Sequence, residues 1–445
     1  MIRRLFIANR GEIALRICRT AQRLGIHVIQ GVSEADRVSA PALLADEIAV
    51  IGPAPSSQSY LAIDRVVAAA VAAKADAVHP GYGFLSENVA FARAVAAAGI
   101  TFVGPDPSSL EAMGDKLKAR SVGIEAGLPV VPGGEAEDAT AARARAGQTG
   151  YPLLIKAVSG GGGRGMKRVD APEQLDAMIS MAMAEAQAAF GDPRVYVERY
   201  IGRGRHVEVQ VLGDGRRAIH LGTRDCSIQR RFQKLVEEAP APGIPPDRLA
   251  ELEDSAVRLA EHLGYRGAGT VEYLVDADSF DFYFLEMNAR IQVEHPVTEA
   301  VTGVDLIEQQ LLIADGQPLG LEQAEVRPTG HAIEVRINAE DWKADFRPSP
   351  GRVTRAGWPA GPGIRVDSHI GHGGVVPPHY DSLMGKVIVA GKDRPDAVAR
   401  LAAALDALTI EGVETTAGLH RAIAADERFR RGGVDTRFFE GLANG

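Results

Sequence analysis

The chain has 445 residues, 46% hydrophobic and 24% charged, which is typical of a globular protein with about two to four domains. A net charge of -9 and only 5% aromatic residues argue against nucleic acid as a main partner. No run approaches the roughly 18 apolar residues of a membrane helix, and the N-terminus does not resemble a signal peptide. Its two cysteines, Cys18 and Cys226, lack metal-binding spacing and suit a reducing compartment, so we expect a cytoplasmic protein.

The first part of the chain alternates predicted strands and helices. Apolar runs predict strands at 2–8, 27–33, 46–52 and 100–105, and helices at 13–24, 64–73 and 88–98. Strands that alternate with helices predict a parallel, doubly wound sheet over residues 1–114. The first turn after a strand reads NRGE instead of GxGxxG, so this Rossmann-like region is not expected to bind NAD.

The pattern changes after Pro129 from parallel to antiparallel signals. Strands at 151–158, 166–170 and 195–201 surround a helix predicted at 172–190. Alternation on both sides of GDG at 213–215 predicts one hairpin, and GTVEYLV with DFYFLEMN predicts a second. From residue 331 the chain has short strands and two late helices, at 394–407 and 415–426. The later domains are therefore expected to be α+β.

A glycine run, KAVSGGGGRGMKR, begins at Lys156. It formally contains GxGxxG, but no helix follows to receive a pyrophosphate, so a dinucleotide fingerprint is disfavoured. A Walker A loop is also disfavoured, because Lys167 is not followed by Ser or Thr. A plain flexible linker remains an alternative. The position between two strands favours a mobile flap whose free N–H groups approach phosphate.

The second predicted hairpin carries two carboxylates and an amide. Glu286 and Asn288 are two residues apart on one strand, so they share a face, and Glu272 on the partner strand can face them. Hard oxygen ligands of this kind suit Mg²⁺, although charges that simply face solvent are the alternative. Downstream, Arg290 offers a planar fork for a small oxyanion, and Glu294 beside it is a candidate general base.

Longer strings identify a family resemblance. Lys116, Lys156, the VYVERY strand and the acidic hairpin follow the order of an ATP-grasp enzyme. The strings that narrow the match are IANRGEIALRI, HPGYGFLSEN, GPDPSSLEAMGDK, IKAVSGGGGRGM, RDCSIQRRFQKLVEEAPAP, EMNARIQVEHPVTE, RINAED, FRPSPG and PPHYDSLMGK. From residue 2 to about 440 the chain resembles biotin carboxylase, as a subunit or as the N-terminal part of an acyl-CoA carboxylase α chain.

The resemblance implies three domains. They are a Rossmann-like pre-ATP-grasp domain at 1–114, an ATP-grasp domain at 115–330 with a mobile lid at about 131–202, and a C-terminal biotin carboxylase domain at 331–445. It also implies ATP, Mg²⁺ (or Mn²⁺), bicarbonate and protein-bound biotin as cofactors and substrates. The expected partners are a second copy of the chain in a homodimer, a biotin carboxyl carrier protein and a carboxyltransferase subunit.

The resemblance also assigns site residues. ATP binding is implied for Lys116, Lys156, Gly162, Gly163, Glu198, Arg199, Tyr200, Ile201, His206, Glu272 and Glu286. The implied metal ligands are Glu272, Glu286 and Asn288. Bicarbonate is expected at Lys234, Arg290, Gln292 and Val293, and catalytic roles at Arg290, Glu294, Lys234 and Arg336. Glu294 is expected to deprotonate bicarbonate, and Arg336 to bind biotin and stabilise its enolate.

The implied reaction is the first half-reaction of an acyl-CoA carboxylase of fatty acid metabolism. ATP and bicarbonate form carboxyphosphate, which carboxylates biotin and leaves ADP and phosphate. The alternatives are another ATP-grasp ligase, which joins a carboxylate to an amine, and an inactive nucleotide-binding regulator. The chain contains no Met-Lys-Met attachment motif, so biotin is expected on another protein or on another part of a longer chain.

Three positions depart from the family pattern. Thr223 stands where Glu is common, Phe232 where many members have His, and Ala289 where Thr or Pro is frequent. Phe232 removes a hydrogen-bonding group near the nucleotide, so a change in nucleotide affinity is expected. HPVTE after the candidate base favours acyl-CoA carboxylases over pyruvate carboxylases.

Overall fold

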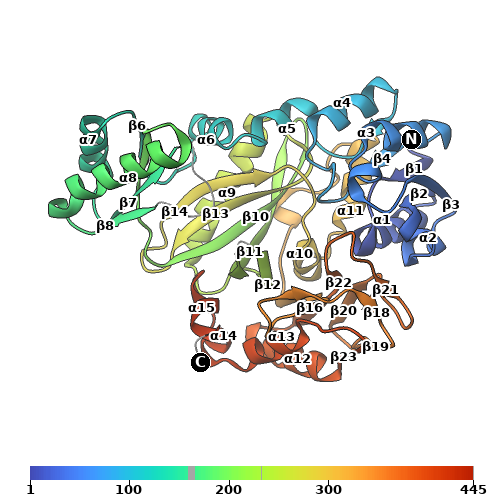
Figure 1. The fold of residues 1–445 in the computed structure, drawn as a ribbon. Coiled ribbons are helices and arrows are strands. Elements are labelled where there is room, and N and C mark those ends of the chain that lie inside the picture. Colours follow the sequence, from blue (N-terminus) through green and yellow to red (C-terminus); the bar gives the residue numbers. More distant parts are fainter. Residues whose placement is uncertain (159–165, 232, 444–445) are drawn as a thin grey trace.

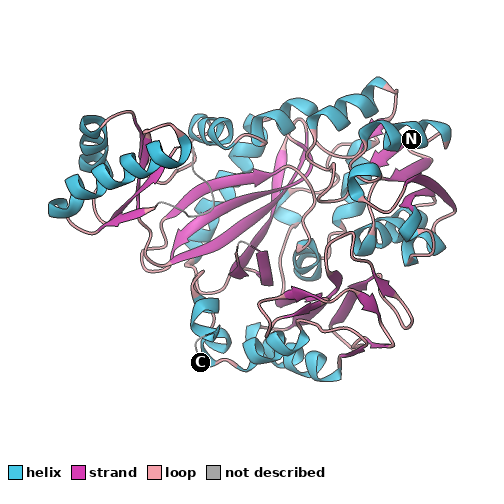
Figure 2. Cartoon of the chain, in the orientation of Figure 1, coloured by secondary structure: helices cyan, strands magenta, loops and turns pink. Residues whose placement is uncertain are grey.

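The computed structural model describes residues 1–158, 166–231 and 233–443. Helices and strands are mixed along the chain (Figure 2). In Figure 1 the N-terminal sheet lies at one end of the molecule, and a small sheet with α7 (Ala139–Thr149) and α8 (Leu175–Phe190) stands at the opposite end. A long sheet lies between them. None of the described helices is long and apolar enough to cross a membrane.

The N-terminal sheet is parallel, as predicted. Within the described residues its strand order is β3-β2-β1-β4-β5. The strands are β1 (Arg4–Ile7), β2 (His27–Ser33), β3 (Glu47–Gly52), β4 (Ala77–His79) and β5 (Thr101–Phe102). The helices between them are α1 (Gly11–Arg23), α2 (Ala40–Leu44), α3 (Ile63–Ala72) and α4 (Val89–Ala97). Apolar side chains of β1 and α1 pack together, and Cys18 is buried among them.

Two helices lead from this sheet to the rest of the molecule. They are α5 (Pro107–Met113) and α6 (Lys116–Glu125). The carboxylate of Asp115 accepts the backbone N–H groups of Leu117 and Lys118, each at 2.9 Å, and so caps α6. The cap fixes Lys116 as the first residue of this helix.

The small sheet contains the strands that flank the glycine run. Its order is β6-β9-β7-β8, with β6 (Gly133–Ala136), β7 (Leu153–Ala157), β8 (Lys167–Val169) and β9 (Val195–Arg199). Strands β7 and β8 pair antiparallel, so the predicted strands on both sides of the run are confirmed. The run itself, with Gly162 and Gly163, lies outside the described residues.

The long sheet joins the middle of the chain to its C-terminal part. Its order is β14-β13-β10-β11-β12-β15-β22-β20. The strands are β10 (Gly204–Asp214), β11 (Ala218–Arg230), β12 (Gln233–Ala239), β13 (Arg266–Asp276), β14 (Phe282–Asn288), β15 (His331–Asn338), β20 (Ile364–Ser368) and β22 (Leu383–Gly391). Both predicted hairpins, β10–β11 and β13–β14, are confirmed. The boundary predicted at 330/331 falls between strands of one continuous sheet, because β12 pairs with β15.

Helices cover this sheet and complete the C-terminal part. They are α9 (Pro246–His262), α10 (His295–Thr302), α11 (Leu306–Ala314), α12 (Arg394–Ala407), α13 (Ala417–Ala425), α14 (Glu427–Arg431) and α15 (Phe438–Ala443). The shorter strands pair two by two and are β16 (Glu340–Asp341), β17 (Arg347–Pro348), β18 (Gly351–Arg352), β19 (Arg355–Gly357), β21 (Val375–Val376) and β23 (Thr409–Glu411). The two late helices predicted from the sequence correspond to α12 and α13.

Candidate active site

Three carboxylates lie side by side on the long sheet. Glu272 of β13 is the cross-strand partner of Glu286 on β14 and of Glu208 on β10. Asn288, two residues after Glu286, is opposite Thr270 on the same pair of strands. The pairing of the hairpin is therefore as predicted, and neighbouring carboxylates of like charge need cations between or beside them.

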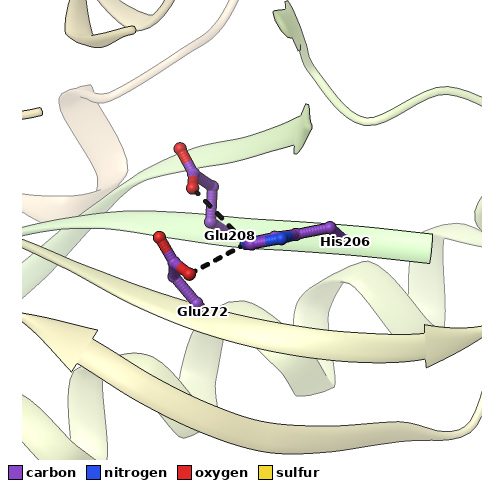
Figure 3. Close-up of side chains that lie close together, drawn as sticks. All are labelled: His206, Glu208 and Glu272. Carbon is purple, nitrogen blue, oxygen red and sulfur yellow. Dashed lines mark ion pairs between the residues drawn. The ribbon is translucent and has the colours of Figure 1, made fainter. Parts of the chain in front are cut away.

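A histidine contacts two of these carboxylates. His206 Nε2 is 2.9 Å from Glu272 Oε2 and 3.9 Å from Glu208 Oε2 (Figure 3). Burial alone would lower the pKa of His206, but contact with Glu272 outweighs burial and raises the pKa. The ligand atoms of His206, Glu208 and Glu272 are close enough together to hold a metal ion.

An ammonium group already supplies positive charge at this position. Lys234 Nζ donates to Glu208 Oε2 at 2.5 Å, to Glu272 Oε1 at 2.9 Å and to Glu294 Oε1 at 2.6 Å. Burial would lower the pKa of Lys234, but the charges of Glu208 and Glu294 outweigh it and raise the pKa well above its ordinary value. Lys234 is therefore a charged clamp that joins three buried carboxylates from three parts of the chain.

Glu294 is the N-cap residue of α10 and lies between two cations. Its Oε1 accepts from Lys234, and its Oε2 accepts from Arg336 Nη2 at 3.0 Å. Burial would raise the pKa of Glu294, but Lys234 and Arg336 outweigh it and lower the pKa. Glu294 is therefore ionised, as a base must be, but both of its oxygens are engaged. Arg336 Nε also donates to Glu237 Oε1 at 2.7 Å.

Arg290 is positioned by a residue of the N-terminal domain. Its Nε donates to Glu87 Oε2 at 2.8 Å, and its Nη2 donates to Asn288 Oδ1 at 2.7 Å. The backbone N–H of Ala289 also donates to Glu87, at 3.1 Å. No motif spacing indicates Glu87, because it is 203 residues away from Arg290 along the chain.

The two remaining residues predicted to bind bicarbonate lie beside this cluster. Gln292 Nε2 donates to Glu272 Oε1 at 2.8 Å. The carbonyl of Val293 accepts from Lys386 Nζ at 2.6 Å, and Lys386 is also 3.2 Å from Glu12 of α1. The loop that precedes α10 is thus fixed by contacts from both the N-terminal and the C-terminal parts of the chain.

The metal ligands expected from the sequence fit a divalent cation. Within the described residues no hydrogen bond or ion pair reaches the carboxylate of Glu286, which faces Glu272 across the hairpin. Burial and the charge of Glu272 raise the pKa of Glu286, an unfavourable state that a cation would relieve. Asn288 donates from Nδ2 to Glu272, while its Oδ1 accepts from Arg290 in this arrangement.

The residues expected to bind nucleotide come from two places. Lys156 Nζ is 2.9 Å from Glu198 Oε1, across the paired strands β7 and β9 of the small sheet. Arg199 is the last residue of β9, and Tyr200 and Ile201 follow it directly. These residues lie together at the junction between the small sheet and β10.

Lys116 approaches the same region from α6. It is exposed at the start of that helix, and its charge partly counteracts the rise in the pKa of Glu286. The exposed ammonium of Lys116 is therefore close enough to Glu286 for the two charges to interact. Polyphosphate with a divalent cation has the charges that both groups need.

Two of the three family departures lie among the described residues. Thr223 is buried, and its Oγ1 accepts the backbone N–H of Ala241 at 3.1 Å. Ala289 is buried next to Arg290, and its backbone N–H donates to Glu87. Phe232 lies outside the described residues.

Sequence reasoning missed two carboxylates that complete this cluster. Glu208 is two residues after His206 on a strictly alternating strand, so a shared face could have been predicted. Glu237 contacts Arg336 across the pairing of β12 with β15, and this pairing had no signal in the sequence.

A small four-stranded sheet, a long sheet that carries paired carboxylates, and a Lys–Glu–Arg cluster are together the architecture of an ATP-grasp enzyme. Three family models match successive parts of the chain. "Biotin carboxylase, N-terminal domain" matches residues 1–110, "Carbamoyl-phosphate synthase L chain, ATP binding domain" matches 115–322, and "Biotin carboxylase C-terminal domain" matches 334–441. The chain belongs to the biotin carboxylase family.

Curated relatives and solved structures agree over the full length. Biotin carboxylase of Pseudomonas aeruginosa is 50% identical over 444 residues, which cover 99% of this chain and 98% of that protein. One subunit of the pyruvate carboxylase of Methanothermobacter thermautotrophicus is 46% identical over 449 residues, which cover 100% and 91%. The biotin carboxylase domain of a thermophilic 2-oxoglutarate carboxylase bound to bicarbonate has a TM-score of 0.94 at 42% identity, covering 100% and 99%. The chain is an ATP-dependent biotin carboxylase.

Proposed function

We propose that bicarbonate is activated at the Lys234–Glu294–Arg336 cluster. A bicarbonate oxygen attacks the γ-phosphorus of ATP while Glu294 takes the bicarbonate proton, and ADP leaves. The resulting carboxyphosphate breaks its bond from carbon to the bridging oxygen to give CO₂ and phosphate. Phosphate then takes the proton from biotin N1′, which bonds to CO₂. The observation that supports this proposal is an ionised carboxylate held between two partly buried cations.

Charge neutralisation is the main requirement of phosphoryl transfer. We assign Lys116, Lys156, Gly162, Gly163, Glu198, Arg199, Tyr200, Ile201 and His206 to the nucleotide. We assign Mg²⁺ (or Mn²⁺) to Glu272, Glu286 and Asn288, where its charge neutralises the phosphates of ATP. The ion pair between Lys156 and Glu198 supports this assignment, because it holds an ammonium group in place before phosphate arrives.

Bicarbonate is assigned to Lys234, Arg290, Gln292 and Val293. In the present arrangement Lys234 and Arg336 lower the pKa of Glu294, and a carboxylate of low pKa is a weak base. We propose that bicarbonate offers its own oxygens to Lys234 and Arg290, which frees one oxygen of Glu294 to accept the proton. Arg336 then stabilises the enolate of biotin, to which it donates in place of Glu294.

The domains and partners follow from the same assignment. We propose limits of 1–114, 115–330 (with a mobile lid at about 131–202) and 331–445, which the three family matches support. Biotin is proposed to arrive on a carboxyl carrier protein and to leave for a carboxyltransferase subunit. One solved relative, from Hydrogenobacter thermophilus, is a domain dimer in complex with MgADP, ADP and bicarbonate, which supports a homodimer here.

The final acceptor is proposed from the sequence alone. HPVTE after Glu294 favours an acyl-CoA. The relatives include a 2-oxoglutarate carboxylase domain and the biotin carboxylase subunit of pyruvate carboxylase, so the acceptor depends on the carboxyltransferase partner. We also propose a cytoplasmic location, which the buried and unpaired state of Cys18 and Cys226 supports.

The proposed reaction predicts ADP release that depends on both bicarbonate and biotin. With MgATP and bicarbonate, free biotin should increase ADP release, and radiolabelled bicarbonate should appear in carboxybiotin. Omission of bicarbonate is the control and should abolish both signals. If added amines replaced biotin, the chain would be another ATP-grasp ligase, and ATP binding without turnover would identify an inactive regulator.

A further inference from the structure

Arg224 is a charged residue of the long sheet that takes no part in the proposed chemistry. It lies on β11 opposite Glu208 of β10, and its side chain is fully buried. A buried guanidinium is costly unless its N–H groups are hydrogen-bonded. The hydrogen-bond partners of Arg224 therefore indicate its role in the structure.

All five N–H donors of this guanidinium are occupied. Four structural elements supply the acceptors: β10, β13, α10 and the loop before α10. Nε donates to Glu208 at 2.5 Å, Nη1 to Gln210 at 2.8 Å and Thr298 at 2.9 Å, and Nη2 to Thr270 at 3.1 Å and Gln292 at 2.8 Å. A planar fork with five donors in fixed directions is required for this set, and lysine cannot reproduce it.

Two of the five acceptors belong to the cluster around Lys234. Arg224 holds Oε1 of Gln292, so the amide is turned with Nε2 toward Glu272. It also holds Oε1 of Glu208, and this leaves Oε2 for Lys234. Arg224 therefore fixes the orientation of the Gln292 amide. It also fixes the carboxylate of Glu208, which is a counter-ion of Lys234.

We propose that Arg224 is a positioning residue of the bicarbonate subsite, which orients the Gln292 amide and holds Glu208 against Lys234. This inference rests on the proposed assignment of bicarbonate to Gln292 and Lys234. Arg224 acts through these two residues, because its own five donors are already used inside the protein. It is therefore distinct from a residue that binds substrate.

Arg224→Lys keeps the positive charge and removes the fork. Without a donor fixed on its Oε1, the Gln292 amide can rotate, and a hydrogen bond to an anionic ligand is lost. We expect the KM for bicarbonate to rise about 10- to 100-fold, while the KM for ATP changes less than about threefold. Steady-state ADP release at varied bicarbonate and varied ATP measures both.

A double-mutant cycle separates positioning from a general structural role. If Arg224 acts through Gln292, Arg224→Lys should have little further effect on the bicarbonate KM when Gln292→Ala is already present. The matched control is Arg205→Lys, since Arg205 is also buried in this sheet but contacts Asp225 and Pro242 instead. This control should lower the Tm and leave the bicarbonate KM unchanged.

Two results would overturn the inference: an unchanged bicarbonate KM in Arg224→Lys, or effects of Arg224→Lys and Gln292→Ala that simply multiply. Binding of ¹³C-bicarbonate, followed by NMR line broadening, provides a test independent of turnover. Weaker binding in Arg224→Lys supports the inference even if the unmodified chain forms no carboxybiotin, an outcome that would refute only the proposed function. Absence of bicarbonate binding by the unmodified chain would refute both.

Discussion

Replacing Glu294 with glutamine is expected to abolish carboxylation while leaving ATP binding near normal. The change keeps the size of the side chain and one of the two oxygens that accept from Lys234 and Arg336, but it removes the negative charge and the group that takes the bicarbonate proton. General base catalysis contributes about 10²- to 10⁴-fold, so kcat for carboxybiotin formation should fall by that factor. Turnover assays with biotin and equilibrium binding of MgATP measure the two expectations separately.

The loss of any buried carboxylate could disturb the fold, so a matched control is needed. Glu238 is also buried and paired, with Arg394 and His331, and within the described residues its carboxylate has no hydrogen bond or ion pair with the Lys234 cluster. Glu238→Gln should lower the Tm and change kcat only a few fold. Near-normal turnover in Glu294→Gln would remove Glu294 from the role of base.

Glu286→Gln is expected to change activity and stability in opposite directions. Removing one carboxylate weakens a divalent cation site, so the Mg²⁺ concentration for half-maximal activity should rise at least about tenfold. Burial and Glu272 raise the pKa of Glu286, which means that the folded state disfavours its ionised form. Stability is therefore lost as pH rises through this pKa, and without metal the variant should have the higher Tm at pH 8.

Magnesium titrations at fixed ATP test the expected loss of magnesium affinity, and thermal melts in EDTA test the expected rise in Tm. The gain in Tm should disappear at a pH below the ordinary range of a glutamate, where the unmodified residue is also neutral. Glu261→Gln on α9 is the control, because Glu261 is exposed and lies on a helix instead of on a strand of the hairpin. Unchanged magnesium dependence in Glu286→Gln would exclude Glu286 as a ligand.

The local part of the site could be predicted from the sequence because strand periodicity determines which side chains share a face. Glu286 and Asn288 were placed together by their spacing of two, and the hairpin pairing then brought Glu272 opposite Glu286. The two late helices at 394–407 and 415–426 were also predicted from the sequence and are confirmed.

The long-range part could not be predicted by such patterns. The charged run QRRFQK at 229–234 is of a kind that usually faces solvent, yet Lys234 in this run donates to three carboxylates, from β10, from β13 and from the N-cap of α10. The contact of Glu87 with Arg290 likewise joins residues about 200 apart, and no local pattern specifies it. Family resemblance supplied the roles of Lys234 and Arg290, while tertiary packing supplies their partners.

The pairing of β12 with β15 has a consequence for how the chain folds during synthesis. A chain released only as far as residue 330 would present β12 as an open edge, with Glu237 lacking its partner Arg336. Unpaired strand edges are templates for aggregation, and the charge of Glu237 would be left without its counter-ion. The long sheet therefore cannot be complete while its C-terminal strands are still inside the ribosome. Assembly of the catalytic cluster is in this sense a late event, completed only when β15 and β22 emerge and close the sheet.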